Sequence, residues 1–123
     1  MPVTTALQAA LAFNLACSGT ERAGPLGLSL PDGPATRFEI SYRIDLDPGR
    51  WCSDACDRTE RIGGVLSTHI LLRDSRSARG RHVIDFDPAT GRLADTLTDG
   101  DRQVLRHGTC TRQPFLGFPG LQA

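Results

Sequence analysis

The chain has 123 residues and a mass of 13.3 kDa, which is enough for one domain but not for two of ordinary size. Hydrophobic residues make up 39% and charged residues 23%, so the composition is that of a globular protein rather than a disordered or fibrous one. Fourteen basic residues, all of them arginine, balance fourteen acidic ones. With no net charge, the molecule as a whole does not attract nucleic acid or an anionic membrane, and we expect no nucleic-acid partner.

The first twenty residues carry no charge. No basic residue follows Met1, and Gln8 and Asn14 interrupt the apolar stretch, so this is not a complete secretory signal. The stretch is also too short and too polar to cross a membrane, and we expect no transmembrane segment. We interpret residues 1–10 as an N-terminal segment with the character of an export-signal remnant.

Apolar residues alternate with small or polar ones from residue 11 to 17, which predicts a first strand with Cys17 facing inward. Residues 21–34 contain three Gly and three Pro and are predicted to be a loop. The clearest alternation follows over residues 38–46, with five apolar positions on one face and four polar positions on the other. This pattern is typical of a half-buried antiparallel strand, and residues 47–49 end it with turn chemistry.

Residues 53–61 are polar, and we expect a short helical turn or an excursion held by Cys52 and Cys56. Residues 65–72 predict a second strand in which Leu66, Ile70 and Leu72 share a face, and residues 73–81 a polar connection. Three further strands are predicted over residues 82–86, 92–98 and 101–111, with a hairpin turn at Asp99-Gly100 and a bulge at Gly108.

About six strands with turns every eight to twelve residues predict an all-β domain over residues 11–112. The expected architecture is a small antiparallel meander that closes into a barrel or sandwich. Residues 113–123 form a tail rich in Pro, Phe and Gly that cannot be regular. Because it carries Phe115 and Phe118, we expect the tail to fold back over an edge of the sheet; if these rings are exposed, they suit a docking partner.

Four cysteines form an even set, which in a short chain is typical of a disulfide framework in an exported protein. The economical pairing is Cys52 with Cys56 and Cys17 with Cys110, which would join the first strand to the last. This favours a periplasmic or secreted location. Reduced thiols, in an intracellular subunit of a larger assembly, are the alternative, whereas a zinc site lacks a second pair of ligands near Cys-x3-Cys.

Two features are candidates for binding. Arg73, Arg76, Arg79 and Arg81 place four cations in nine residues, a loop suited to phosphate, lipopolysaccharide or an acidic partner, although a solvated loop explains it equally well. Trp51 is the only tryptophan, and we expect it to pack on the neighbouring disulfide; exposed, it would be a binding hot spot.

Catalytic signals are weak. The motif Ile-Asp-x-Asp-Pro occurs twice and would present two pairs of carboxylates, suited to acid–base chemistry or calcium, but strand ends that run into turns explain it more simply. The histidines fall on three predicted strands, and no nucleophile or phosphate-binding motif is present. The aspartates of the motif and the histidines are Asp45, Asp47, Asp85, Asp87, His69, His82 and His107. We expect none of them to be catalytic, and we expect no metal and no cofactor.

Several segments together resemble a group of small cysteine-containing proteins of proteobacteria that have no known activity. They are Phe-Asn-Leu-Ala-Cys-Ser-Gly-Thr at 13–20, Ile-Asp-Leu-Asp at 44–47 with Arg-Trp-Cys at 50–52, Ile-Asp-Phe-Asp at 84–87, and Gly-Thr-Cys at 108–110 with Pro-Phe-Leu-Gly-Phe-Pro at 114–119. The resemblance implies export. The plan is also similar to that of periplasmic inhibitors of c-type lysozyme, although residues 18–22 do not match their Ser-Gly-x-x-Tyr signature.

The leading hypothesis is therefore a small exported binding or accessory protein without catalytic activity, whose partner is another protein. An inhibitor-like protein that binds an enzyme such as lysozyme is one alternative. A hydrolase or metal-dependent enzyme that uses the paired aspartates is the other.

Overall fold

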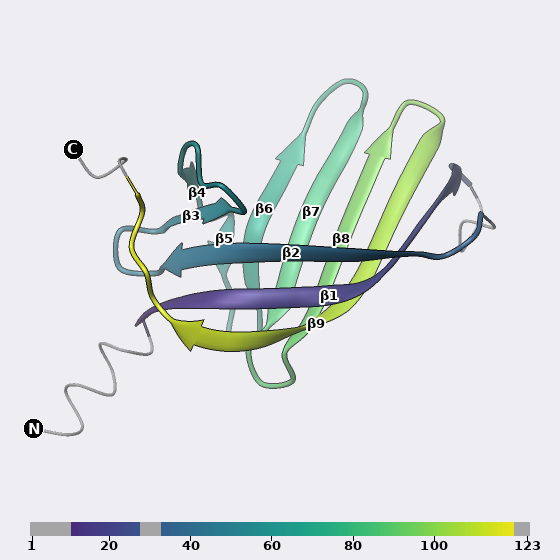
Figure 1. Ribbon diagram of the computed structural model, residues 1–123. Helices are drawn as coiled ribbons and strands as arrows, with labels where there is room; N and C mark the ends of the chain where they lie inside the picture. Colours follow the sequence, from purple (N-terminus) through teal and green to yellow (C-terminus); the bar gives the residue numbers. More distant parts are fainter. Residues whose placement is uncertain (1–10, 28–32, 120–123) are drawn as a thin grey trace, which may run out of the picture.

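The computed structural model describes residues 11–27 and 33–119, and these residues form one antiparallel β-sheet (Figure 1). Its strand order is β4-β3-β2-β1-β9-β8-β7-β6-β5. The N-terminal segment of residues 1–10 lies outside the described residues. The nine strands found in the described ranges are β1 (Ala12–Pro25), β2 (Thr36–Asp45), β3 (Arg50–Ser53), β4 (Glu60–Arg61), β5 (Gly64–Val65), β6 (Ile70–Arg76), β7 (Gly80–Asp87), β8 (Arg92–Asp99) and β9 (Arg102–Pro114).

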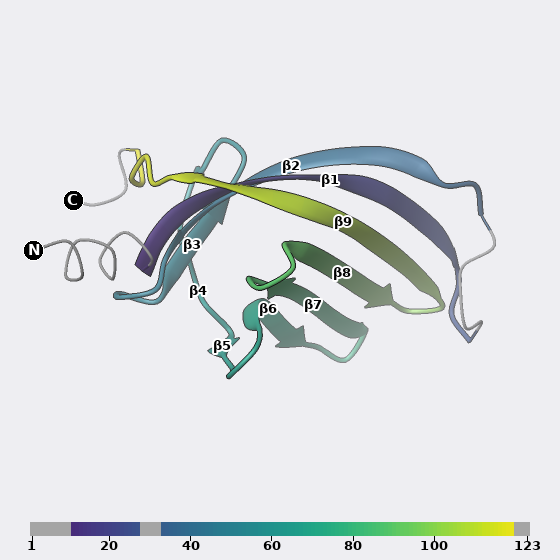
Figure 2. The ribbon, with the colours of Figure 1, turned by 90° about the horizontal axis from the view of Figure 1, so that it is seen from below.

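The sheet curls into a half-barrel. Strands β1, β2 and β9 form one layer that crosses in front of β6, β7 and β8, and Figure 2 shows the two layers from below. The short edge strands β4 and β5 follow each other in the chain, so the segment between them passes from one edge of the sheet to the other. Within it, Ile62 N–H donates to the Gly49 carbonyl at 2.9 Å and Gly63 N–H to the Leu72 carbonyl at 3.2 Å. The half-barrel is therefore tied together on the side where β3, β4 and β5 lie.

The concave face of the curled sheet holds the hydrophobic core. Alternation predicted from the sequence places Phe38, Tyr42 and Ile44 of β2 on this face, and all three are buried. In the first strand Phe13, Leu15 and Cys17 are buried as expected, but Leu11 is 43% exposed because it precedes the strand. The core is completed by Trp51, Ile70, Leu72, Ile84, Phe86 and Leu93.

Both predicted disulfides are present: Cys17 is joined to Cys110, and Cys52 to Cys56. Cys17 and Cys110 are direct cross-strand partners in β1 and β9, so the bridge joins the first strand to the last. Cys52–Cys56 closes the tight turn after β3, where Asp54 and Cys56 adopt positive φ angles of 49° and 55°. Of the two alternatives predicted for residues 53–61, the structure has the excursion held by Cys52 and Cys56, and these residues form no helix.

The prediction of about six strands was wrong, and two segments account for much of the difference. Residues 65–72 are not one strand: the chain turns between β5 and β6, and Leu66 is 57% exposed in that turn. Residues 73–81 are not a polar connection, because β6 continues to Arg76 and β7 begins at Gly80. Backbone pairing continues through these polar residues, since Asp74, Ser75 and Arg76 of β6 pair with Val83, His82 and Arg81 of β7.

Strand β1 also extends further than predicted. It runs through Glu21 to Pro25 alongside the start of β9, so the predicted loop is shorter, and residues 28–32 of it lie outside the described residues. Pairing along β9 is continuous, so the predicted bulge at Gly108 is absent, and the irregularity in register lies in β6 between Leu71 and Arg73.

Gly108 has a different role: it lies opposite Gly19, and this glycine pair lets β1 and β9 approach closely beneath the ring of Phe38.

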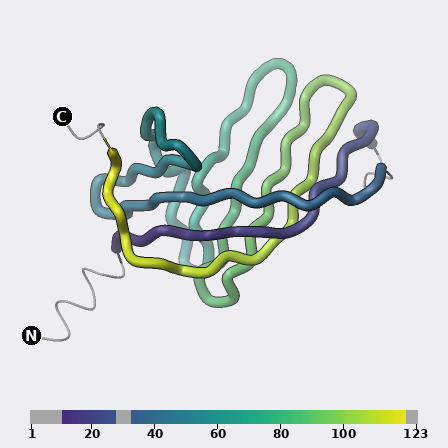
Figure 3. Tube along the Cα trace, viewed as in Figure 1, coloured from purple at the N-terminus to yellow at the C-terminus, as the bar shows by residue number. Residues whose placement is uncertain are grey.

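The C-terminal tail folds back as its aromatic residues suggest. Leu116 N–H donates to Asn14 Oδ1 at 3.3 Å, and Arg43 Nη1 donates to the Gly117 carbonyl at 2.8 Å. Phe115 and Phe118 stack edge to face with their ring centroids 5.2 Å apart, and both are half-buried. Figure 3 shows this part of the chain beside the beginning of β1 and the end of β2.

Candidate functional site

A row of charged side chains crosses the concave face of the half-barrel. Its members alternate in sign along the row apart from one histidine, and five of them lie on strands that are consecutive neighbours in the sheet, the sixth on β4 at the opposite edge. We call this row the charge belt. It consists of Glu21 (β1), Arg106 (β9), Asp95 (β8), His82 (β7), Arg73 (β6) and Glu60 (β4).

One half of the charge belt centres on Arg106. Its Nε donates to Glu21, its Nη1 lies 3.9 Å from Asp95 Oδ2, and its guanidinium lies over the Phe38 ring at 5.3 Å. Burial works against the charge of Arg106, but the hydrogen bond to Glu21 and the charges of Glu21 and Asp95 raise its pKa above the usual value. This side chain therefore stays charged and joins β1, β9 and β8.

The other half centres on Arg73, which contacts three strands. It donates to Glu60 of β4, lies 5.4 Å from the Trp51 ring centroid of β3, and its Nη1 lies 3.1 Å from His82 Nδ1. An arginine only donates, so His82 Nδ1 must accept, and the histidine proton is on Nε2, which donates to Asp95 at 2.7 Å. Arg73 thus links β6 to β3 and β4, at the other end of the strand order, through side chains.

The hydroxyl of Tyr42 is buried among core side chains and the charge belt. The side chain is 1% exposed, and its hydroxyl has no hydrogen-bond partner among the described residues. Burial raises the pKa of the hydroxyl far above its usual value, and the negative charge of Asp95 raises it further. An unpartnered buried hydroxyl costs stability, so the change Tyr42→Phe has a clear expected effect.

Tyr42→Phe is expected to raise the free energy of unfolding at neutral pH by about 1 kcal/mol, because it removes a buried polar atom that has no partner. Tyr42 is the only tyrosine and the chain has no lysine, so in the unfolded chain it is the one side chain that should titrate near pH 10. The unfolded chain loses this proton above pH about 10 while the folded chain keeps it, so stability must fall as the pH rises past that value and be unaffected below it.

Denaturant unfolding at pH 7 and pH 11, with tyrosinate absorbance of the folded protein, measures both effects. Tyr42→Phe should remove the decline between these two values. Tyrosinate absorbance appearing near pH 10 in the folded protein would contradict a buried hydroxyl.

The predicted arginine cluster is divided between two places. Arg73 belongs to the charge belt, whereas Arg76, Arg79 and Arg81 surround the tip of the β6–β7 hairpin. A depression of about 400 Å³ lies here. It is lined by Ser75, Arg76, Ser77, Arg79, Gly80, Arg81, His82, Leu97, Thr98 and Asp99.

Carboxylates orient two of the hairpin arginines. Arg79 Nε donates to Asp99 at 2.6 Å, and Arg81 Nε donates to Asp74 at 3.1 Å, where the hydrogen bond lowers the pKa of Asp74. Both bonds use Nε, so the terminal NH₂ groups of these guanidinium ions remain to meet an anion. Arg76 is exposed and makes no ion pair within the described part of the chain.

The other predicted binding residues lie apart from the hairpin. Trp51 does not share a face with the neighbouring Cys52, because adjacent strand residues point in opposite directions. Its ring lies on the concave face, 5.8 Å from the Tyr42 ring, and its Nε1 donates to the Arg61 carbonyl at 3.2 Å. The structure therefore brings Trp51 to Arg73, whereas the half-buried Phe115 and Phe118 lie on the tail.

Some of the predicted aspartates and histidines lie together on the outer face of the sheet. His69, Asp85, Asp87 and His107 line a depression of about 580 Å³, and His69 Nδ1 lies 2.6 Å from Asp85 Oδ1. His82 is on the opposite face, in the charge belt. Among the described residues no three His, Cys, Asp or Glu side chains are placed to hold a metal ion.

The repeated Ile-Asp-x-Asp-Pro motif serves turns in this structure. Asp87 Oδ1 accepts the Ala89 N–H at 2.9 Å, which lowers the pKa of Asp87, and Asp45 Oδ1 accepts the Asp47 N–H at 3.2 Å. These are the local bonds that aspartate makes at the beginning of a turn. The simpler interpretation of the motif therefore accounts for both copies.

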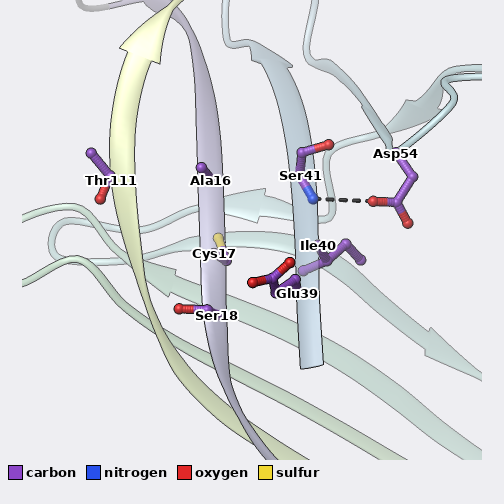
Figure 4. Close-up of a pocket in the computed structure, with 8 residues that line it drawn as sticks. All are labelled: Ala16, Cys17, Ser18, Glu39, Ile40, Ser41, Asp54 and Thr111. Carbon is purple, nitrogen blue, oxygen red and sulfur yellow. Dashed lines mark hydrogen bonds between the residues drawn. The ribbon is translucent and has the colours of Figure 1, made fainter. Parts of the chain in front are cut away.

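A hollow of about 620 Å³ lies on the outer face over β9, β1 and β2. Figure 4 shows the residues that line it. Its walls are mainly small side chains such as Ala16, Ser18 and Thr111. At its far side the Ser41 N–H donates to Asp54 Oδ1 at 3.1 Å, one residue beyond the end of β3. The hollow is a shallow part of a sheet face and offers few charged groups.

Glu21, Tyr42, Glu60, Asp95 and Arg106 were not predicted as site residues from the sequence. The available signal was a charged residue on the apolar face of a strand, as with Asp95, which lies two residues after the buried Leu93. Which charges would meet depended on the order of strands in the sheet.

The described residues include no helix that is long and apolar enough to cross a membrane. No known protein family, curated protein or solved structure matches the chain.

Proposed function

We propose that the protein is a small exported binding protein that holds an acidic segment of another protein with the arginines of the β6–β7 hairpin. The observation that carries this proposal is the arrangement of Arg76, Arg79 and Arg81 around one depression. Two of these guanidinium groups are held by carboxylates through Nε, and the third is unpaired among the described residues. Guanidinium groups held in this way offer two parallel N–H bonds to a carboxylate without first having to be ordered.

Exposure supports binding rather than a structural role for these arginines. The Arg79 side chain is 75% exposed and that of Arg81 is 46% exposed. Exposed ion pairs contribute little to stability, so they are not needed to hold the hairpin together. The same pairs fix the direction of each guanidinium group, which is what recognition of a carboxylate requires.

Export is supported by the two disulfides, which leave no free cysteine among the described residues. Disulfides persist in oxidising compartments such as the periplasm and the extracellular space. A small domain gains most from them, because its core alone supplies limited stability.

Charge reversal tests the binding proposal. The wild-type protein is expected to bind a fluorescein-labelled decapeptide of alternating Glu and Thr, measured by fluorescence anisotropy. It should bind this probe at least about tenfold more tightly than the matching Lys–Thr peptide, and added salt should weaken the complex. Arg76→Glu combined with Arg79→Glu should weaken acidic-peptide binding by at least about tenfold, because it replaces attraction with repulsion.

The matched control is Arg58→Glu combined with Arg92→Glu, which changes the net charge equally at two exposed arginines away from the hairpin. It should retain most of the affinity. Equal losses in both double variants would show that only net charge matters, and absence of binding by the wild type would contradict the proposal.

A further inference from the structure

His82 is the member of the charge belt whose charge changes under mild conditions. Among the side-chain types in the belt, histidine is the one that normally gains or loses a proton between pH 5 and pH 8. The His82 side chain is 22% exposed, so protons from the solvent reach its ring. A response of the charge belt to mild acid therefore begins at this residue.

Both ring nitrogens of His82 are engaged while the imidazole is neutral. Nδ1 accepts from Arg73 Nη1 at 3.1 Å, and Nε2 donates to Asp95 Oδ1 at 2.7 Å. A second proton has only Nδ1 to bind to, where it would point at the Nη1 group of Arg73. A guanidinium group has no acceptor atom, so two positively charged donors would then face each other. The hydrogen bond between Arg73 and His82 therefore exists only while the imidazole is neutral.

The surrounding charges decide which of the two His82 contacts is lost on protonation. A protonated imidazole makes a charge-assisted hydrogen bond to Asp95, whose side chain is only 9% exposed, whereas Arg73 becomes a second cation beside it. His82 therefore stays with Asp95, and Arg73 moves away from the ring. The hairpin arginines border the same depression as His82. The groups brought to this part of the concave face by other strands are Arg73 (β6), Asp95 (β8), Arg106 (β9), Glu60 (β4), Glu21 (β1) and the Tyr42 hydroxyl (β2).

Arg73 is the link through which a change at His82 reaches the other end of the strand order. It donates to Glu60 of β4, and its guanidinium lies 5.4 Å from the Trp51 ring centroid of β3. The segment that follows Glu60 carries the two backbone hydrogen bonds that tie the half-barrel together. Once Nη1 has left His82, Glu60 alone bonds the guanidinium, so the contact with Trp51 and the tied segment are both held less firmly.

We propose that His82 is a proton-operated switch in the charge belt: in mild acid its imidazole takes a proton on Nδ1, releases Arg73 and loosens the tie across the half-barrel. The proton comes from the solvent, and Nε2 keeps its hydrogen bond to Asp95. This inference goes beyond the proposed function, because it concerns the concave face and requires no partner.

A titration of the wild-type protein between pH 8 and pH 5 tests the switch directly. The ¹⁵N signal of His82 Nδ1 should change from that of an acceptor nitrogen to that of a donor nitrogen, while Nε2 remains a donor throughout. The emission of Trp51, the single tryptophan, should change over the same range, because Arg73 leaves its ring. Both signals should share one midpoint and the steepness of a single proton.

His82→Gln removes the proton-binding step and keeps the hydrogen-bonding groups. Its amide offers an oxygen to Arg73 and an N–H to Asp95 but gains no proton in this range, so the emission of Trp51 should be independent of pH. The matched control is His107→Gln, which changes an exposed histidine on the outer face of β9. This control should titrate as the wild type does.

Amide hydrogen exchange measures the tie itself. At pH 5 the Ile62 and Gly63 amides should exchange about fivefold faster in the wild type than in His82→Gln, the factor that corresponds to one lost hydrogen bond. At pH 8 the two proteins should exchange these amides at the same rate. Comparing the proteins at one pH removes the intrinsic effect of pH on exchange.

Three results would overturn the switch. A proton already on Nδ1 at pH 8 would mean that this nitrogen does not accept from Arg73. Emission of Trp51 that is constant in the wild type, or that changes equally in His82→Gln, would show that His82 does not control Arg73. Equal exchange of the two amides at pH 5 would show that the tie does not depend on this contact. The titration of the wild type decides the first question even if His82→Gln does not fold.

Discussion

Replacing Cys17 and Cys110 together with serine is expected to lower the free energy of unfolding by about 4.7 kcal/mol, because the bridge closes a long loop that is costly to order in the unfolded chain. The two cysteines are 93 residues apart and join neighbouring strands β1 and β9. Guanidinium unfolding of the oxidised proteins, followed by tryptophan fluorescence, measures the change. Trp51 is buried in the core and is the single tryptophan, so its emission reports global unfolding.

The matched control is replacement of Cys52 and Cys56, which are only 4 residues apart and should cost about 2 kcal/mol. Equal losses from the two changes would contradict the loop-length argument.

The same cysteines test export: protein isolated from its native cells without reductant should show no reactive thiol after denaturation. Four reactive thiols would contradict both the bridges in the native protein and the oxidising compartment.

Gly108→Ala is expected to lower the free energy of unfolding by about 3 kcal/mol through overpacking. A Cβ atom at this position would lie 2.3 Å from the Ser18 carbonyl oxygen and 3.1 Å from Phe38 Cζ. The first of these atoms belongs to the backbone of β1 and cannot rotate away, so the two strands must separate next to the Cys17–Cys110 bridge. The same unfolding measurement quantifies the loss.

Gly64→Ala is the control for the general effect of adding a methyl group to a strand glycine. No heavy atom lies within 4 Å of a Cβ built on Gly64, and its φ is not positive. This variant should lose no stability, because the added methyl group restricts the unfolded chain without a clash. If Gly108→Ala were as stable as Gly64→Ala, the close approach of β1 and β9 would not be a requirement of the fold.

Local patterns predicted those features that depend on neighbouring residues. The alternation over residues 38–46 identified the buried face of β2, since strand side chains point to opposite faces in turn whatever the strand pairs with. The disulfide partners also followed from the sequence, because one pair is close in the chain and only one other pair remains.

The failures of prediction occurred where side chains form interactions at long range. The polar stretch from Arg73 to Arg81 is predicted as a connection because it has no apolar face, yet it forms the outer part of the β6–β7 hairpin. Arg73 contacts Glu60 of β4 and Trp51 of β3, which lie at the other end of the strand order. These partners are far away in the chain, so the local sequence does not report them.

The sequence by itself determined the all-β class, the inward face of the main strands and the pairing of the cysteines, since each depends on spacing along the chain. Only the tertiary structure decided how the sheet curls, and the curl places Arg73 beside Trp51 and assembles the charge belt from six separate strands. Strand order and curvature arise from packing of the whole sheet, so residues far apart in the chain become neighbours only when that packing is complete.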